Sequence, residues 1–382
     1  MTRAVHITGL GLATPLGGTL DKTWQALLGS KYIIDHARVS DLCDGPGLRI
    51  NRLSASVARE ALAGSNWSAS QIAGAALVIG TSKGPVDGWL AEIPSECECF
   101  YGMSEVAARL AAEFRIGGPR VTMSAACASG LHALIRATML IQQGDADRAL
   151  VIGAESSLHP MFLQSFRRLG VLAPPHIGCR PFDEHRSGFL MSEAAAAICL
   201  EASDLTEPPR GRITIDRFAL AGDATNLVGI DPDGRTLRRL LNQTIDHRPI
   251  NLMHAHGTGT ASNDPIELAA IEAALPVDPT GQKPHLYSHK GALGHSLGAA
   301  GMVALVINCL AHRDQIVPPN VRTSAPLEAA GLRISQKAER RSIGRSVVAA
   351  SGFGGAAAAV SIISTVISTA PVESSEAMPP TA

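Results

Sequence analysis

The pattern that most constrains the fold is an alternation of short apolar segments with stretches of helical periodicity, and it occurs twice in succession. Residues 5–17 (VHITGLGLATPLG) and 212–225 (RITIDRFALAGDAT) open in the same way, with a strand-like run that leads to glycine. Short apolar strands that alternate with helices are typical of mainly parallel, buried sheets. Two such series in tandem predict an α/β fold with pseudo-twofold symmetry and a functional site between its halves.

The two halves meet at a break rich in proline and arginine, EPPRGR (207–212). We therefore expect an N-terminal half over residues 1–206 and a C-terminal half over 207–366. The tail 367–382 is polar and contains proline, and it is predicted to be disordered.

Composition excludes several classes of function. The formal charge of −1, the pI near 6.9 and the 4 % of aromatic residues offer no basis for binding nucleic acid or an anionic membrane surface. The seven cysteines are odd in number and irregularly spaced, and no apolar leader is visible, so a cytoplasmic location is expected.

Residues 346–370 carry no charge and are long enough to cross a bilayer. However, three glycines in SGFGG (351–355) interrupt this run, and the residues after them are rich in valine and isoleucine. Two buried strands joined by a glycine turn are predicted here, with no membrane span.

One cysteine lies among small residues in VTMSAACASGLHAL (121–134). A strand-like run precedes it, and apolar residues at helical spacing follow from Ser129. Cys127 is thus expected at a strand-to-helix turn, where the helix dipole favours the thiolate. A small buried hydrophobe is the other interpretation of such a cysteine, so catalysis requires a second half of the site.

That second half is offered by two histidine segments flanked by glycine, HAHGTGTASNDPIE (254–267) and HKGALGHSLGAAG (289–301). His256 and His295 follow predicted strands, and Lys290 lies one short loop before His295. A lone histidine is commonly structural, but ligands gather at the carboxyl ends of parallel strands. We therefore expect these three residues to meet Cys127 there.

A cysteine, two histidines and a lysine suit acyl transfer, because a thiolate accepts and releases acyl groups. Two neutral imidazoles that donate N–H to one oxygen would stabilise an enolate. A zinc site is the alternative, but glycine turns at strand ends are not a ligand spacing, and lysine is an unfavourable neighbour. Cys97 and Cys99 have no matching pair either, so neither a metal nor a bound cofactor is expected.

The chain resembles the β-ketoacyl-acyl carrier protein synthases of the elongating KAS I/II type. Five motifs carry the resemblance in order, from Val5 to about Ser364: SAACASG, RPFDEHRSGFLMSE, HGTGTASNDPIE, KGALGHSLGAAG and SGFGG. The resemblance implies a thiolase fold, with two βαβαβαββ halves in a five-layered αβαβα core. It also implies decarboxylative Claisen condensation between an enzyme-bound acyl group and malonyl on acyl carrier protein. Phosphopantetheine would arrive on that carrier.

The resemblance also assigns catalytic roles. Cys127 would be the acylated nucleophile, and His256 and His295 would hold the malonyl thioester carbonyl during decarboxylation. Lys290 would organise the electrostatics around His295. The backbone N–H groups of Cys127 and Phe353 would form the oxyanion hole.

Further residues are assigned to substrate binding or support. Phe353 of SGFGG would also act as a gate, and Thr258 and Thr260 would contact the phosphopantetheine arm. Gly102 and Phe189 would border the acyl chain. Two acidic residues that follow the first histidine, Asp264 and Glu267, are expected to be structural.

The chain departs from the family near its end. The usual SFGFGGTN reads ASGFGGAA over residues 350–357, and Ala304 stands where an acidic residue is common. These changes predict that no metal binds, and they favour a specialised pathway such as polyketide or aryl polyene assembly over housekeeping fatty acid synthesis. Gly102 would leave the acyl pocket open to a long or rigid chain.

Two alternatives belong to other classes. A non-catalytic chain-length factor would shape the pocket of a ketosynthase heterodimer, but such subunits usually lack the nucleophile. A thiolase would need a cysteine in the terminal glycine loop, and SGFGG has none. The expected partners are acyl carrier protein and either a second copy of the chain or a subunit of the chain-length-factor type.

Overall fold

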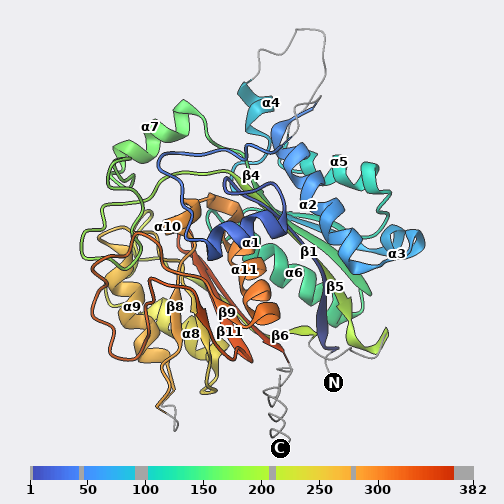
Figure 1. Ribbon diagram of the computed structural model, residues 1–382. Coiled ribbons are helices and arrows are strands. Elements are labelled where there is room, and N and C mark those ends of the chain that lie inside the picture. Colours follow the sequence, from blue (N-terminus) through green and yellow to red (C-terminus); the bar gives the residue numbers. More distant parts are fainter. Residues whose placement is uncertain (1–2, 43–46, 91–101, 206–211, 277–280, 365–382) are drawn as a thin grey trace, which may run out of the picture.

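The computed structural model describes residues 3–42, 47–90, 102–205, 212–276 and 281–364. Within these ranges a ten-stranded sheet has the strand order β3-β2-β4-β5-β1-β6-β12-β11-β7-β8 (Figure 1). From each outer edge of the sheet to its centre, the strand order is β3-β2-β4-β5-β1 in the first half and β8-β7-β11-β12-β6 in the second. The halves join where β1 and β6 pair antiparallel over three residues. The predicted α/β fold with two repeated halves is therefore confirmed.

The elements of the first half follow the predicted alternation of strands and helices. Its strands are β1 (Val5–Ala13), β2 (Ala76–Gly80), β3 (Arg120–Met123), β4 (Arg148–Glu155) and β5 (Ala194–Ala202). Its helices are α1 (Leu20–Leu28), α2 (Arg49–Ser65), α3 (Ala69–Gly74), α4 (Val86–Leu90), α5 (Glu105–Phe114), α6 (Ser129–Gln143) and α7 (Pro160–Arg168), followed by the 3₁₀ turn η1 (Ser203–Leu205).

The second half repeats this arrangement with shorter parallel strands. Its strands in the large sheet are β6 (Ile213–Gly222), β7 (Leu252–His254), β8 (His285–Tyr287), β11 (Arg345–Ser351) and β12 (Ala356–Ser364). Its helical elements are α8 (Arg235–Ile245), α9 (Asn263–Ala274), α10 (Lys290–Leu293), the 3₁₀ turn η2 (Leu297–Ala299) and α11 (Ala300–Asp314). A small ribbon pairs β9 (Ile316–Val317) with β10 (Glu339–Arg340).

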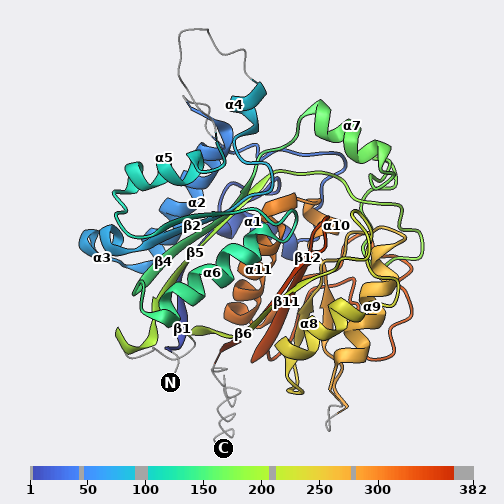
Figure 2. The ribbon, with the colours of Figure 1, turned by 180° about the vertical axis from the view of Figure 1, so that it is seen from behind.

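The helices α6 and α11 form the central layer of the molecule (Figures 1 and 2). They touch each other, and each contacts strands of both halves: α6 packs on β2, β4 and β12, and α11 packs on β4, β5 and β11. Residues 300–312 of α11 are all buried, as expected for a helix that is covered on every side. Outer helices complete the layers, with α2 and α5 on the first half and α8 and α9 on the second.

The uncharged C-terminal segment forms the two strands predicted for it. β11 and β12 pair antiparallel from Arg345 opposite Ile363 to Ser351 opposite Ala357. Gly354 and Gly355 turn the chain between them with φ values of 83° and 81°, which favour glycine. No helix in the described ranges is both long and apolar enough to span a membrane. The predicted disordered tail lies outside those ranges.

Candidate active site

Cys127 lies in a tight turn between β3 and α6. The residue before it, Ala126, has a φ of 48°, which is unusual without glycine and holds the turn in a sparsely populated conformation. Ser129 supports this shape, because its Oγ accepts the N–H of Ala125 at 2.9 Å and donates to the carbonyl of Ala126 at 2.6 Å. The cysteine therefore stands on a locally fixed backbone.

The glycine loop of the second half packs directly against this turn. A Cβ placed on Gly352 would lie 2.7 Å from the carbonyl oxygen of Ala125 and 3.0 Å from the backbone nitrogen of Cys127. Only glycine allows such a close approach. The peptide that leads from Gly352 to Phe353 is thereby brought beside the turn that carries Cys127.

His256 follows β7 in a loop held from below by α9. The buried carboxylate of Glu267 accepts the N–H groups of His256 at 2.6 Å and Gly257 at 2.7 Å. Asp264, also buried, accepts the N–H groups of Gly259 at 3.1 Å and Phe182 at 2.7 Å. Both carboxylates hold backbone and neither lines the pocket, so their roles here are structural.

Lys290 begins α10 and is 1 % exposed. Its Nζ donates a hydrogen bond to the carbonyl oxygen of His256. The neighbouring Ser288 donates its hydroxyl to the carbonyl of Gly257 at 2.9 Å. The lysine thus supports the loop of His256 directly, and its charge also acts on His295, around which the resemblance expects it to organise the electrostatics.

His295 lies between β8 and α11 and is held by its backbone. Its N–H donates to Leu190 at 2.7 Å, and its carbonyl accepts from Ser192 at 3.0 Å. The ring stands edge-on to those of Phe189 and His256, with centroids 4.9 Å and 5.4 Å away. Its Nδ1 is buried and has no hydrogen-bond partner among the described residues.

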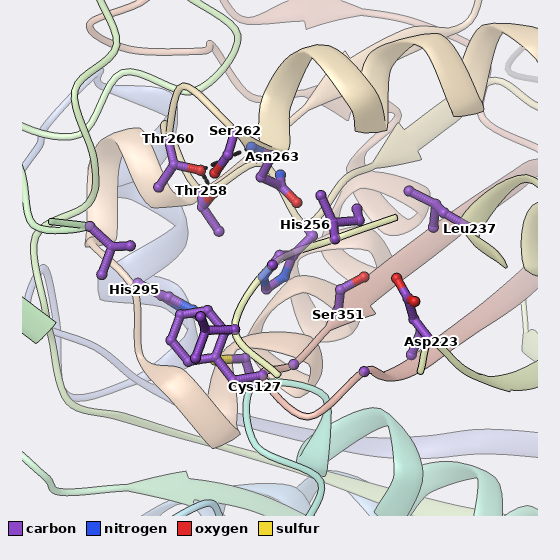
Figure 3. A pocket seen from close by; sticks show the side chains of 18 of the residues that line it. Cys127, Asp223, Leu237, His256, Thr258, Thr260, Ser262, Asn263, His295 and Ser351 are labelled. Atoms are coloured by element: carbon purple, nitrogen blue, oxygen red, sulfur yellow. Dashed lines mark hydrogen bonds between the residues drawn. The ribbon is translucent and has the colours of Figure 1, made fainter. Parts of the chain in front are cut away.

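Cys127, His256 and His295 line one pocket that contains about 830 Å³ of open space (Figure 3). The other predicted residues on its wall are Phe189, Thr258, Thr260 and Phe353. The hydroxyls of the two threonines lie 2.9 Å apart.

Gly102 is not brought to this pocket. It lines a separate hollow beside the edge strand β3, together with Met103 and Arg120.

The electrostatics of the site differ between its two sides. Burial raises the pKa of the Cys127 thiol to about 11, although the charges of Lys290 and Lys83 pull this pKa down. Burial therefore outweighs the attraction of the two lysine charges. Burial and Lys290 together lower the pKa values of His256 and His295 well below that of free histidine. Both imidazoles are consequently neutral at physiological pH, and each neutral ring still has one N–H group to donate.

Several residues of the site escaped the sequence analysis. Lys83 follows β2 and lies 5.5 Å from the ring centroid of Phe162 in α7. The pocket wall also includes Phe166 of α7, whose ring centroid is 5.8 Å from that of Phe189 and 6.2 Å from that of Phe353. Its position after an apolar strand could have indicated Lys83 as a site residue. No pattern in the sequence of α7 indicated Phe166.

The far wall of the pocket contains three further residues that were not predicted to contact substrate. In Figure 3, Ser351, Asp223 and Leu237 lie on the opposite side of His256 from His295. Ser351 marks the position where the family's first phenylalanine is missing.

No group of three or more His, Cys, Asp or Glu side chains that could hold a metal ion occurs among the described residues. Cys97 and Cys99, considered from the sequence as half of a metal site, lie outside them.

Solved structures of two ketosynthase systems share this fold. A chain of a type II polyketide synthase ketosynthase, in complex with its acyl carrier protein and bound to the hexaketide, has a TM-score of 0.82 at 22 % identity and covers 95 % of this chain and 100 % of that one. A chain of the ishigamide ketosynthase/chain length factor has a TM-score of 0.84 at 21 % identity, with coverage of 95 % and 100 %. The fold is therefore of the thiolase type, as predicted.

Family models and curated relatives then define the family. The beta-ketoacyl synthase N-terminal domain matches residues 49–205, and the beta-ketoacyl synthase C-terminal domain matches residues 214–324. The chain belongs to the beta-ketoacyl synthase family of acyl-transferring condensing enzymes.

One relative is the "Putative polyketide beta-ketoacyl synthase 1" of Streptomyces cyaneus, 32 % identical over 68 % of this chain and 64 % of the relative, so the match spans slightly less than two thirds of that protein. Another is the 3-oxoacyl-[acyl-carrier-protein] synthase 2 of Coxiella burnetii, 27 % identical over 92 % of this chain and 96 % of the relative.

Proposed function

We propose that this protein catalyses decarboxylative condensation of malonyl-acyl carrier protein with an acyl chain bound to Cys127. The observation that carries the proposal is the presence of one thiol and two neutral imidazoles, Cys127, His256 and His295, on the wall of a single pocket.

In the first step the sulfur of Cys127 attacks the thioester carbonyl of the incoming acyl carrier. Its proton leaves with the phosphopantetheine thiol, and the acyl group remains on the cysteine. The N–H groups of Cys127 and Phe353 are proposed to hold the oxyanion. The close packing of Gly352 on the cysteine turn supports this assignment.

In the second step malonyl-carrier binds and the bond to its carboxylate breaks. Carbon dioxide leaves, and the electron pair remains as an enolate. The enolate oxygen accepts hydrogen bonds from the N–H groups of His256 and His295. The enolate carbon then attacks the Cys127 thioester, and the C–S bond breaks to return the thiolate. Thr258 and Thr260 are proposed to contact the phosphopantetheine arm, and Phe353 to gate the acyl pocket.

The chemistry of the pocket supports a specialised pathway, such as polyketide or polyene assembly. Phe166, Phe189 and Phe353 form an aromatic wall near the nucleophile, and Ser351 and Ala357 leave the far wall small. A relative named for polyketide synthesis agrees with this assignment. Fatty acid synthesis is the other pathway, since a 3-oxoacyl-[acyl-carrier-protein] synthase 2 is also similar.

The proposed partners are an acyl carrier protein and a second ketosynthase-like chain, in a homodimer or a heterodimer. The two similar structures are named for a carrier complex and for a ketosynthase/chain length factor. A cytoplasmic location is proposed with them. No protein-bound cofactor or metal is included in the proposal.

The test is the intact-protein mass after incubation with acyl-carrier protein, for the wild type and Cys127→Ala. We expect an acyl mass shift that disappears in the variant. If the folded wild type takes up no acyl group from carriers of short, long and aromatic chains, the protein is instead a non-catalytic subunit of the chain-length-factor type.

A further inference from the structure

Two buried histidines that the mechanism does not use lie next to two residues that it does. His254 ends β7, two residues before His256, and His289 directly precedes Lys290 after β8. Both are at most 1 % exposed. The Nδ1 of His289 lies 2.9 Å from the Nε2 of His254, and the ring planes are inclined at 66°.

Asn308 of α11 determines which ring nitrogens of His254 and His289 carry a proton. Its amide nitrogen donates to the hydroxyl of Ser346 at 3.1 Å, so its oxygen faces Nδ1 of His254 at 2.8 Å and accepts that proton. The Nε2 of His254 is then the acceptor for Nδ1–H of His289. The Nε2 of His289 is left without a proton and without a partner among the described residues.

The same hydrogen-bond chain continues into the core. Ser346 of β11 lies 2.9 Å from Nε2 of His312, whose Nδ1 lies 2.7 Å from the hydroxyl of Ser364 at the end of β12. The histidine pair is thus anchored to α11, β11 and β12, which are among the most buried elements of the molecule. Burial and the Lys290 charge lower the pKa values of both members of the pair, so the pair remains uncharged.

Strand pairing alone does not fix the two catalytic loops. β7 and β8 pair over only three residues each, up to His254 opposite Tyr287. Beyond that point the loops are joined by Lys290 to the carbonyl of His256, by Ser288 to Gly257, and by the histidine pair.

We propose that the hydrogen bond between His254 and His289 is a positioning device, which sets the loop of His256 against the loop of Lys290. The inference rests on the proposed function and adds two positioning residues to it. It follows that the pair matters for malonyl decarboxylation, in which His256 acts, and not for acylation of Cys127, which stands on the separate turn between β3 and α6. A displacement of about 1 Å in such a loop can reduce a rate by about 100-fold.

The test compares His289→Asn with His289→Gln. An asparagine amide can replace the donor at Nδ1, whereas a glutamine amide reaches the position of Nε2 and removes that side-chain hydrogen bond, which leaves the Nε2 of His254 with the backbone N–H of His289 at 3.4 Å. His289→Leu removes both groups. The matched control is His6→Gln, which replaces a buried histidine of β1 outside this hydrogen-bond chain.

Two half-reactions are measured on each full-length variant. The first is acylation of Cys127, by intact mass. The second is the release of carbon dioxide from malonyl-pantetheine, which gives kcat and KM, with the melting temperature recorded alongside. If the wild type fails to acylate, the proposed function fails. The positioning role is judged on the decarboxylation rate of each variant relative to the wild type, with acylation as the internal reference where it occurs.

We expect His289→Gln and His289→Leu to lose about tenfold or more in kcat for decarboxylation, with acylation changed by less than about twofold. His289→Asn should recover most of the loss, and His6→Gln should resemble the wild type. The inference is overturned if Asn and Gln behave alike, or if both half-reactions fall together in proportion to the melting temperature. Should His289→Leu not fold, the comparison of Asn with Gln still decides.

Discussion

The two halves of the molecule use equivalent strands for different chemistry. In the first half, β2 and β3 lead to Lys83 and Cys127, and in the second half the equivalent strands β7 and β8 lead to His256 and Lys290. The nucleophile turn consists of small residues and is held by one serine and by close packing. The loop of His256 is held by buried carboxylates, by Lys290 and by the hydrogen bond between His254 and His289.

The difference follows from what each half has to do. In the proposed reaction, a nucleophile that carries an acyl group needs room and access, which small residues give. Groups that stabilise an enolate need fixed orientation and fixed protonation, which a buried polar network supplies at the cost of desolvation. The comparison predicts that a substitution can slow acylation of Cys127 or decarboxylation of malonyl without slowing the other half-reaction.

The largest separation is expected from His295→Ala. Loss of one N–H donor to the enolate should lower malonyl decarboxylation by about 100-fold or more, because such donors act in a water-poor site. Acylation of Cys127 should persist, since the nucleophile turn is untouched. Carbon dioxide release and intact mass are measured on the same preparation, and equal losses in both would contradict the division between the halves.

The contact between the halves is tested by Gly352→Ala. The added methyl group would meet the carbonyl oxygen of Ala125 at 2.7 Å, so the glycine loop or the nucleophile turn must shift. Overpacking of this kind typically costs about 1–3 kcal/mol of unfolding free energy, and here both half-reactions should slow together. Urea denaturation gives the stability change.

The control for this substitution is Gly222→Ala. A Cβ at Gly222 meets nothing within 4 Å, so its effect on stability and activity should be small. If Gly352→Ala is equally mild, the glycine loop does not press on the nucleophile turn.

A smaller effect is expected from Lys83→Met, which acts on the nucleophile half alone. The Lys83 charge lowers the pKa of the Cys127 thiol, which burial holds near 11, so its removal should raise that pKa further. The thiolate fraction at any pH below 11 then falls. Alkylation of Cys127 by iodoacetamide at about pH 8 should slow by about two- to tenfold, with Lys83→Arg close to the wild type. Unchanged alkylation would mean that Lys83 does not influence the thiol.

The sequence predicted the parts of the fold that depend on periodicity. Apolar runs that lead to glycine marked β1 and β6, the first strand of each half, and the uncharged segment interrupted by SGFGG marked β11 and β12. Because ligands gather at strand ends, Cys127, His256 and His295 could be placed together before their distances were known.

Other features depend on contacts between segments far apart in the chain, and the sequence did not reveal them. Phe166 reaches the pocket from α7, which no motif connects to the site. The hydrogen bond of Lys290 to the carbonyl of His256 depends on how two loops cross. Gly102 was assigned to the acyl pocket by resemblance, but the structure places it in a separate hollow beside β3. The pKa of Cys127 is set mainly by burial, which three-dimensional packing determines.

The most direct test of the condensing site is a single turnover of the acylated enzyme. Wild-type protein carrying one acyl group on Cys127 is freed of the acyl carrier and mixed with malonyl-carrier, and both the protein mass and the carrier product are followed. We predict that the protein returns to its unmodified mass as an equal amount of β-ketoacyl-carrier forms and carbon dioxide is released. An acyl group that remains on Cys127, or that is lost only by hydrolysis, would contradict the claim that the two halves together form a condensing site.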